Sequence, residues 1–395
     1  MAISDYASRS APREREGSAV LAFVRRLDWV LFGAVVAVVA YGLWGVAGIT
    51  RFEVEGDERY YVVRQAIAIG LGFAGLLVAL AVDPERYRRA YRSIFGSTIL
   101  LVLLVFPFAD ETRGAKRWIE LGPFQFQPSE FGKLLFVLAL AGFLADRARR
   151  LHEGRVVFQA LALGAIPIAL VFKQPDLGTA LVYGAALLAC LFVAGIRWPH
   201  FIGLLALGVA CAVSVLVLLP RLGVELLEPY QKDRLTGFTK PDFDPGDTTY
   251  NVNQSITAIG SGGFDGRGVA GATQTRFGFT PESRTDFVFS SFAEQRGFVG
   301  AALLLGLYLL IVWRGLRVVT VARDAFGAIV AGGIVLAFLF QVFVNVGMTM
   351  GLAPVTGIPL PFVTVGGSSM VVNLLAMGVL LSIHARGSLG GRRAG

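Results

Sequence analysis

The stretch QSITAIGSGGFDGRGVAGATQTRFGFTPESRTDFVFSSFAEQRGFVG, from Gln254 to Gly300, is polar and glycine-rich in a chain that is otherwise mostly apolar. It carries a carboxylate, Asp286, just before a long apolar run. The 395 residues are 55% hydrophobic and 16% charged, whereas soluble domains carry about 25% charged residues. Apolar runs long enough to cross ~30 Å of hydrocarbon flank the stretch and predict a polytopic α-helical membrane protein. We expect any chemistry in the polar stretch.

Ten apolar stretches predict an all-α fold of about ten transmembrane helices, in one membrane domain over 28–385. A large polar loop at 220–285 separates the seventh and eighth spans. Residues 1–27 hold five Arg and no apolar segment like that of a signal peptide, so we expect a disordered cytosolic tail there. A second cytosolic tail is expected at 386–395. The stretches cover about 28–49, 61–82, 93–108, 128–145, 156–172, 177–195, 198–219, 286–313, 325–350 and 358–384.

The positions of the charges predict the topology. With the N-terminus in the cytosol and the sides alternating, the cytosolic segments hold 20 basic and 9 acidic residues. The other side, with the span residues that face it, holds 16 basic and 19 acidic residues. This bias follows the positive-inside rule and places both termini in the cytosol and the loop at 220–285 outside. The net charge of +8 therefore reflects membrane topology, and we expect no nucleic-acid partner.

This topology restricts the chemistry of the outer face. All three histidines, His152, His200 and His384, fall at cytosolic edges, and no cysteine lies outside. Outer-face chemistry must then use carboxylates, Lys, Arg, hydroxyls or backbone groups. The glycine run GSGGFDGRG at 260–268 lacks the spacing of a nucleotide-binding loop, so we reject that function. Its glycines permit positive φ or close backbone approach, and such backbone can offer N–H groups to an anion.

The first outer group of candidate residues lies in GAKRWIELGPFQFQPSEFGK, Gly114 to Lys133. Lys116 and Arg117 precede an aromatic, amphipathic piece, and a helix is expected to begin just before Glu130. Lys133 follows Glu130 by three residues, so the two can pair on one helix face. Two interpretations remain open. The segment is either a helix start with interfacial anchors or a basic site for an anionic lipid headgroup.

Two further segments place a carboxylate at a helix start. Asp176 in KQPDLGTA suits the N-terminus of the sixth span, as a cap or as a carboxylate facing an outer cavity. In TPESRTDF we expect a helix start, with Arg284 and Asp286 in its first turns. Asp286, Ser290, Ala293 and Gly297 then form one polar or small stripe, as a groove wall would. A charge near a helix N-terminus is the plainer interpretation of Asp286.

Glycine and proline interrupt the last two apolar stretches, in FVNVGMTMGLAPVTGIPLPFVTVGGSSMVVN at 343–373. Irregular backbone at membrane depth must be buried in protein or line a cavity. Transporters use broken helices in this way, so this segment taken alone favours a transporter.

Together these segments resemble the SEDS family (shape, elongation, division, sporulation). The resemblance covers about residues 28–385, and the motifs occur in family order and at family spacing. The forms YN-x-x-QS, AIGSGG and GATQ are more similar to the elongation branch of the family than to the division branch. The matching segments are GAKRWIELGPFQFQPSEFGK, KQPDLGTAL, YNVNQSITAIGSGGFDGRG with GATQTRFGFTPESRTDFVF, and NVGMTMGLAPVTGIPLPFVTVGGSS.

The resemblance implies a peptidoglycan glycosyltransferase that polymerises lipid II into glycan strands at the outer face of the bacterial cytoplasmic (inner) membrane. It implies a class B penicillin-binding protein as crosslinking partner, together with other membrane proteins of the elongation complex. Lipid II would be the substrate, and undecaprenyl pyrophosphate the group released. The essential aspartate of the family lies in its PE-x-x-TDF motif, which corresponds to Asp286 here.

The sequence departs from the family pattern at three places. Arg284 stands where the family often has His, Glu294-Gln295 where it often has Glu-Glu, and Thr364-Val365 where it has Ser-Tyr. These departures change residues that neighbour the motifs and leave Asp286 in place.

The implied reaction needs a base, positive charge for the departing pyrophosphate, and a groove that aligns two lipid-linked sugars. We assign the base to Asp286, because the topology excludes histidine. The metal site is unknown, and a divalent cation, Mg²⁺ or Mn²⁺, is the candidate cofactor. The glycine run is a further candidate for binding pyrophosphate. The predicted substrate-binding residues are Lys116, Arg117, Glu130, Lys133, Asp176, Gln254, Gln274, Glu282, Arg284, Ser368 and Ser369, of which Glu130 and Asp176 would orient Lys133 or a metal.

Three alternatives stay open at this point. A flippase for a lipid-linked cell-wall precursor fits the broken helices, but the polar residues are concentrated on the outer face and a flippase needs access from both. A division-type polymerase of the same family is the second alternative. A catalytically silent scaffold is the third, and the intact PESRTDF argues against it.

Overall fold

The computed structural model describes most of the chain. The predicted N-terminal tail up to residue 21, the loop residues 222–246 and the C-terminal residues 388–395 lie outside the described part. The described residues are 22–54, 56–109, 111–112, 115–121, 124–221, 247–280 and 282–387.

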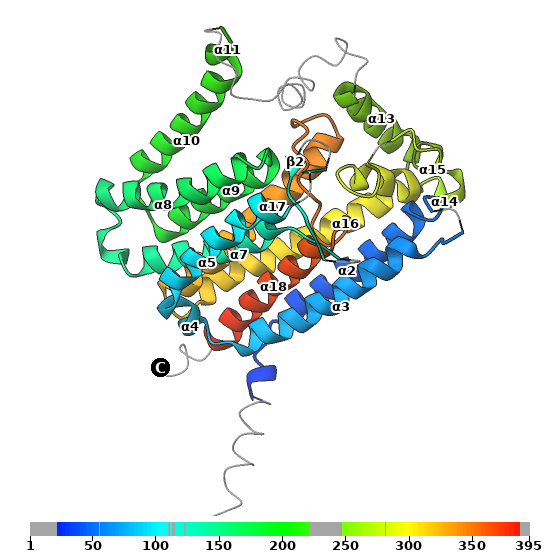
Figure 1. Ribbon diagram of the computed structural model, residues 1–395. Coiled ribbons are helices and arrows are strands. Elements are labelled where there is room, and N and C mark those ends of the chain that lie inside the picture. Colours follow the sequence, from blue (N-terminus) through cyan, green and yellow to red (C-terminus); the bar gives the residue numbers. More distant parts are fainter. Residues whose placement is uncertain are drawn as a thin grey trace, which may run out of the picture.

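The described part of the chain is a bundle of long apolar helices that run side by side (Figure 1). Nine of them are long and apolar enough to cross a membrane, and α10 (Trp198–Val213) is a shorter apolar helix at the place of the predicted seventh span. The predicted all-α membrane fold is confirmed. The nine spans are α2 (Trp29–Ile49), α3 (Tyr60–Ala81), α5 (Tyr91–Leu103) with α6 (Val105–Phe108), α7 (Pro128–Ala145), α8 (Gly154–Phe172), α9 (Leu177–Ala194), α16 (Val288–Val321), α17 (Ala325–Thr349) and α18 (Gly367–Gly387).

Burial separates central helices from peripheral ones. In α18, 83% of the apolar window is buried inside the protein, against 17% in the span formed by α5 and α6. Helices α7 and α17 are also mostly buried, so these three form the centre of the bundle. Small residues let the helices approach closely. A methyl group at Gly378 of α18 would collide with the backbone of Leu76 in α3.

The structure differs from the prediction at two helix boundaries and in one segment that forms a hairpin. The last span begins at Gly367 and not near 358, because residues 350–366 form an irregular, largely buried segment. Helix α16 begins at Val288, and its backbone leaves the helical region at Gly297, with φ 66° and ψ −168°. The predicted amphipathic piece after Arg117 is a small hairpin, in which β3 (Ile119–Leu121) pairs with β4 (Phe124–Phe126). It follows a second antiparallel pair, β1 (Glu111–Thr112) with β2 (Ala115–Lys116).

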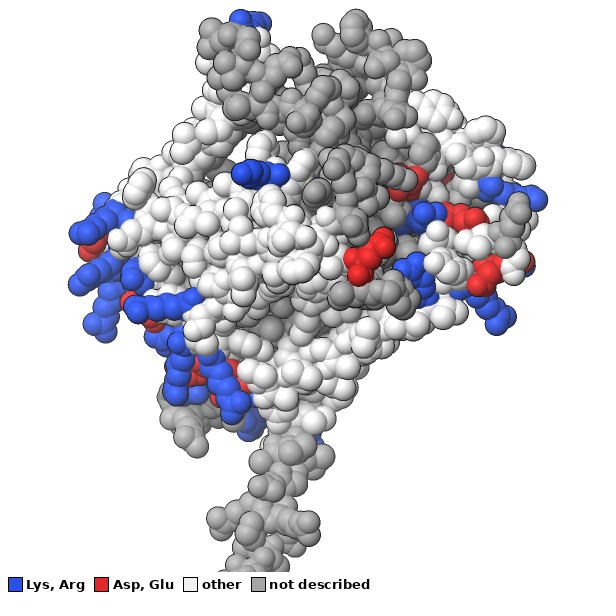
Figure 2. All heavy atoms as spheres, in the orientation of Figure 1, with Lys and Arg blue, Asp and Glu red and all other residues white. Residues whose placement is uncertain are grey.

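The two ends of the bundle carry different elements. One end holds the hairpins and the helices α13 (Asp247–Gly262), α14 (Gly268–Gly271) and α15 (Thr273–Arg276) (Figure 1). The other holds α4 (Pro84–Arg89) and the short helix Ala148–Arg150, and blue Lys and Arg atoms gather there (Figure 2). We call these the hairpin end and the basic end. The first and last described segments meet at the basic end, where His384 Nδ1 lies 3.2 Å from the Arg26 carbonyl oxygen.

Candidate functional site

Asp286 lies at the hairpin end, in a turn over residues 282–287 that immediately precedes α16. The prediction that Asp286 and Arg284 occupy the first turns of the helix is therefore wrong. Glu282 opens the turn with a φ of 52°, a region that few non-glycine residues adopt. The Thr285 hydroxyl donates to the Glu282 carboxylate at 2.7 Å and closes the turn. Asp286 itself is half-buried.

The turn is held by α17 and by the irregular segment before α18. Asn345 Nδ2 donates to the backbone oxygens of Asp286 at 3.0 Å and Ile358 at 2.8 Å. Thr364 Oγ1 donates to the Thr285 carbonyl at 3.1 Å. The N–H of Val365 donates to the Arg284 carbonyl at 3.0 Å. Contacts on either side of Asp286 therefore fix the backbone from which its carboxylate projects.

Arg284 is charge-compensated in the structure. Its guanidinium forms an ion pair with Glu53, from the connection between α2 and α3, and lies 4.5 Å from the centre of the Tyr61 ring. Ser283 Oγ donates to the same carboxylate at 3.3 Å. Sequence analysis missed Glu53, because nothing in TRFEVEG signals a partner 231 residues away. This pairing weakens the assignment of Arg284 to a phosphate.

Asp176, Arg117 and Gln127 meet at the start of α9. Asp176 caps the helix by accepting from the Thr179 N–H at 3.1 Å. Its second oxygen accepts from Gln127 Nε2 at 3.2 Å, and Arg117 Nη1 lies 3.9 Å from its first. Arg117 also donates to the Pro175 carbonyl. The capping interpretation of Asp176 is confirmed, and the cap is also the partner of a predicted anion-binding arginine. The interpretation as a carboxylate facing an outer cavity stays a prediction. The side chain of Lys116 lies outside the described part.

Glu130 and Lys133 form the predicted ion pair on α7, with Lys133 Nζ 3.0 Å from Glu130 Oε2. Both side chains are buried, at 2% and 8% exposure, and not at a solvated surface. A cavity of about 30 Å³ lies against Lys133 and is also lined by Gln341 and Asn373. That is room for a water molecule. Within the described residues, Gln341 Nε2 is buried with no hydrogen-bond partner.

Ser368 connects the two halves of the site. Its Oγ accepts from the Gln127 N–H at 2.9 Å and donates to the Gln125 carbonyl at 2.9 Å, which ties the hairpin to the start of α18. Ser369 Oγ accepts from Asn373 Nδ2 at 3.2 Å. The segment 364–368 therefore contacts the Asp286 turn at one end and the neighbourhood of Asp176 at the other.

Gln65 is a second residue that sequence analysis missed. It projects from α3 and is 2% exposed. Its Nε2 donates to the Thr364 carbonyl at 3.2 Å, and its Oε1 accepts from the Gly366 N–H at 3.3 Å. A lone glutamine inside an apolar span was an available signal, because polar groups at membrane depth need partners.

The glycine run packs against α16, contrary to its predicted role as an anion-facing loop. The N–H of Arg267 donates to the Glu294 carbonyl at 2.9 Å, and the N–H of Phe298 to the Gly263 carbonyl at 2.9 Å. Methyl groups at Gly266 or Gly297 would collide with the facing backbone. These glycines, at φ 84° and 66°, let two backbone segments touch at the kink of α16.

Gln274 belongs to a structural contact around Glu294. The Glu294 carboxylate is 0% exposed. It accepts from the backbone N–H of Gln274 and of Thr275 at 2.9 Å each, and from the Thr275 hydroxyl at 2.7 Å. Gln254 lies half-buried on α13, one residue before Ser255, which donates to the Thr349 carbonyl at 2.7 Å.

An apolar groove of about 620 Å³ runs between α13 and α16. Phe289, Ala293 and Gly297 form its wall on α16. The predicted stripe is therefore right for Ala293 and Gly297. It is wrong for Ser290, which is fully buried and donates to the Phe287 carbonyl at 2.7 Å. It is also wrong for Asp286, which lies in the turn before α16 and does not line the groove.

The carboxylates of the site are dispersed. Among the residues that the structure describes, no group of three or more His, Cys, Asp or Glu side chains is placed to hold a metal ion. Mg²⁺ often binds through one or two carboxylates, waters and substrate phosphates. A cation at this site would accordingly take much of its coordination from the substrate.

The fold and the site define a multi-pass membrane protein with a structured polar site at one end of its bundle. The chain belongs to the FtsW/RodA/SpoVE (SEDS) family, whose model, described as "Cell cycle protein", matches residues 20–388.

Relatives and solved structures of this family cover most of the chain. It is 36% identical over 338 residues to "Peptidoglycan glycosyltransferase MrdB" of Escherichia coli K12, covering 86% of this chain and 89% of that protein. A chain from the structure "Structural coordination of polymerization and crosslinking by a peptidoglycan synthase complex" matches with a TM-score of 0.76 and 32% identity, over 91% of this chain and 98% of that one. Rod shape determining protein RodA of Thermus thermophilus matches with a TM-score of 0.65 and 30% identity, over 91% and 96%.

Proposed function

We propose that this chain is a peptidoglycan glycosyltransferase that polymerises lipid II into glycan strands at the outer face of the cytoplasmic membrane during cell elongation. The name of the Escherichia coli relative supports the activity. The RodA likeness supports the elongation branch. One structural observation carries the assignment of the site: the turn that bears Asp286 is anchored by Asn345, Thr364 and Val365 at the hairpin end of the bundle.

In this proposal Asp286 is the general base. It accepts the proton of the attacking sugar hydroxyl while that oxygen bonds to the anomeric carbon of the second, pyrophosphate-linked sugar. The bond from that carbon to the pyrophosphate oxygen breaks, and undecaprenyl pyrophosphate leaves. A fixed backbone matters because a small displacement of the base lowers the rate strongly.

Arg117 is the proposed contact of the departing pyrophosphate, because Lys133 is buried beside a cavity that has room only for a water molecule. The buried Nε of Arg117 has no hydrogen-bond partner within the described residues, and Glu130 and Asp176 hold the two basic side chains in place. Fixed positive charge in a site of low dielectric stabilises a leaving pyrophosphate more than it would in water. The apolar groove of about 620 Å³ beside α16 is the proposed binding place for part of the polyprenyl chain.

A divalent cation and a crosslinking partner complete the proposal. Glu130 or Asp176 would hold Mg²⁺ or Mn²⁺, and the cation would supply positive charge for the departing pyrophosphate. Removal of divalent cations with EDTA should lower polymerisation, and returning Mg²⁺ or Mn²⁺ should restore it. The class B penicillin-binding protein is proposed because the similar solved chain comes from a complex that couples polymerisation to crosslinking. Co-purification from membranes tests that partner.

The central experiment gives the purified chain lipid II in detergent and resolves the products by gel electrophoresis. Glycan strands are expected. A flippase would leave lipid II unchanged, because detergent removes the barrier across which it acts. Absence of polymer, both from the chain alone and from the chain co-purified with its class B penicillin-binding protein, would overturn the proposal. Localising the tagged chain to the side wall or the septum separates elongation from division.

A further inference from the structure

An apolar slot of about 260 Å³ opens between α5, α7 and α8 at the basic end of the bundle. On α7 its lining runs from Phe136 to Phe143, whereas Glu130 lies in the first turn, about 9 Å before Phe136, and no residue of the proposed site lines the slot. The slot is therefore separate from the site around Asp286. Its lining includes the side chains of Phe95, Phe136, Leu140 and Leu163.

Two arginines, Arg92 and Arg147, stand at the mouth of this slot. The same two side chains line a neighbouring polar hollow of about 560 Å³, which adds Arg149 and Arg150. The slot and the hollow therefore share one rim. An apolar compartment thus adjoins a strongly basic one, which is the arrangement that an anionic amphiphile requires.

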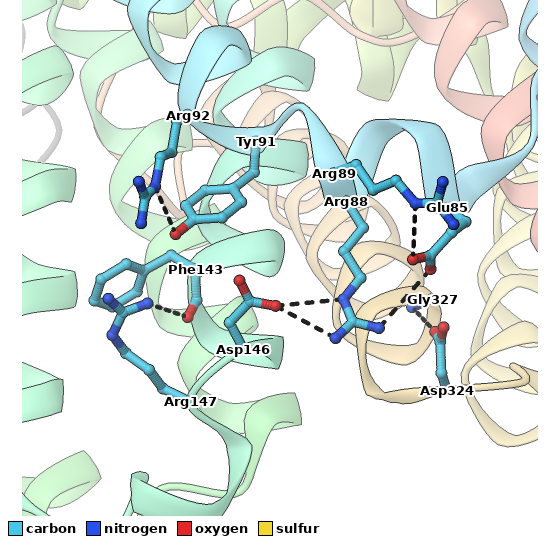
Figure 3. Close-up of polar contacts among 10 residues, drawn as sticks. All are labelled: Glu85, Arg88, Arg89, Tyr91, Arg92, Phe143, Asp146, Arg147, Asp324 and Gly327. Atoms are coloured by element: carbon cyan, nitrogen blue, oxygen red, sulfur yellow. Dashed lines mark hydrogen bonds and ion pairs between the residues drawn. The ribbon is translucent and has the colours of Figure 1, made fainter.

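The acid nearest this rim is already bound. Asp146, which also lines the hollow, accepts through Oδ1 from Arg88 Nε at 3.4 Å and from Arg88 Nη2 at 3.3 Å (Figure 3). Among the described residues, neither Arg92 nor Arg147 forms an ion pair with a carboxylate. The rim therefore keeps its positive charge.

Contacts with neutral groups hold both guanidinium groups in place. Arg147 stacks 4.0 Å from the centre of the Phe143 ring, and its Nη1 donates to the Phe143 carbonyl at 3.2 Å. Arg92 Nε donates to the Tyr91 hydroxyl at 3.3 Å (Figure 3). Each guanidinium has five N–H donors in a planar fork that suits phosphate, and these contacts use only part of them.

We propose that this cleft binds an anionic phospholipid of the cytosolic leaflet. Its phosphate lies against Arg92 and Arg147, and part of one acyl chain enters the apolar slot. Basic pockets between transmembrane helices on the cytosolic side bind anionic headgroups in other membrane proteins. We choose a lipid over a free phosphate because only a lipid has an apolar part that could enter the slot. A free phosphate would bind in the polar hollow alone. The inference does not depend on the proposed glycosyltransferase activity.

Native mass spectrometry of the purified full chain tests the site, with phosphatidylglycerol and phosphatidylethanolamine of matched acyl chains as probes. The wild type is expected to prefer phosphatidylglycerol, and R92A/R147A to bind it at least tenfold more weakly. The variant L163W fills the slot from its exposed side without changing the charge, and should weaken binding several-fold. R155A/R317A is the matched control, since it removes two exposed arginines, in α8 and near the end of α16, that do not line the cleft.

Each outcome decides the question. Weaker binding by R92A/R147A and L163W, with an unchanged melting temperature and an intact control, supports a lipid site. Wild-type binding by R92A/R147A, or an equal loss in the control, overturns it in favour of general attraction to a basic surface. Displacement of the lipid by glycerol 3-phosphate, with no effect of L163W, overturns it in favour of a free-phosphate site.

Discussion

The proposed catalytic site and the cleft at the basic end differ in how their basic side chains are paired. In the site, three basic side chains pair with carboxylates: Lys133 with Glu130, Arg117 with Asp176, and Arg284 with Glu53. In the cleft, Arg92 and Arg147 contact only neutral groups within the described part of the chain, although other arginines of the basic end are paired. Pairing positions a charge, whereas an unpaired arginine offers its charge to a ligand.

This difference in pairing indicates which function suits each region. A buried pair such as Glu130–Lys133 is costly to desolvate and is stable only with good geometry, so it suits a site that must orient a substrate. Exposed arginines beside a cytosolic leaflet are attracted to anionic lipid at about 1 kcal/mol each. The following predictions test this division, beginning with the largest expected effect.

Replacing Asp286 with asparagine should remove polymerisation. The amide keeps the shape of the side chain but cannot take the hydroxyl proton, and loss of a general base typically costs about 10²–10⁴-fold in rate. The measurement is strand synthesis from lipid II in detergent. Melting temperature should stay near that of the wild type, because the turn is held through backbone atoms of residues 284–286.

Asp265→Asn is the matched control for that experiment. Asp265 is exposed in the glycine run at the same end of the bundle, so the substitution removes the same charge outside the proposed site. Near-normal polymerisation by D286N, or an equal loss in D265N, would show that Asp286 is not the base.

Removing one partner of the buried pair should destabilise the protein strongly. Lys133→Ala leaves the Glu130 carboxylate buried without its cation, which typically costs about 3–5 kcal/mol. The double variant E130A/K133A should recover much of that loss, because no uncompensated charge remains. Thermal unfolding in detergent measures both. A double variant less stable than K133A would mean that the pair contributes more than charge compensation.

The apolar patterning in the sequence was sufficient to predict the fold. In the described part of the chain, nine long apolar helices match predicted stretches, because a segment that crosses the membrane must satisfy its backbone polar groups within a helix. Local pairs were also predictable. Glu130 and Lys133 are three residues apart on one helix, so their spacing determines the contact.

Long-range polar contacts could not be predicted in this way. Glu53 reaches Arg284 across 231 residues of chain, and Gln65 reaches Thr364 across 299. Neither pairing follows from local periodicity. The glycine run shows the related limit: its composition indicated unusual backbone, but not whether that backbone faces an anion or another helix.

Arg284→Ala tests a weaker pair at the hairpin end. The Arg284 side chain is 36% exposed. Exposed or partly exposed ion pairs contribute about 0–1 kcal/mol to stability, because solvent screens their attraction. We expect R284A to lower the melting temperature slightly. Polymerisation should be retained, because the Arg284 guanidinium is paired with Glu53 and not with the substrate. A loss of polymerisation as large as that of D286N would instead assign Arg284 to the substrate.

Arg51→Ala should have the smallest effect, because the Arg51–Glu58 pair is 52% and 62% exposed although its atoms are 3.1 Å apart. That distance nearly equals the 3.0 Å of the buried Glu130–Lys133 pair. Exposed pairs gain little, since water screens the attraction and two mobile side chains must be ordered. A comparison of R51A with K133A by thermal unfolding therefore varies burial at nearly constant distance. Equal destabilisation would mean that proximity, and not burial, determines what an ion pair contributes at the hairpin end.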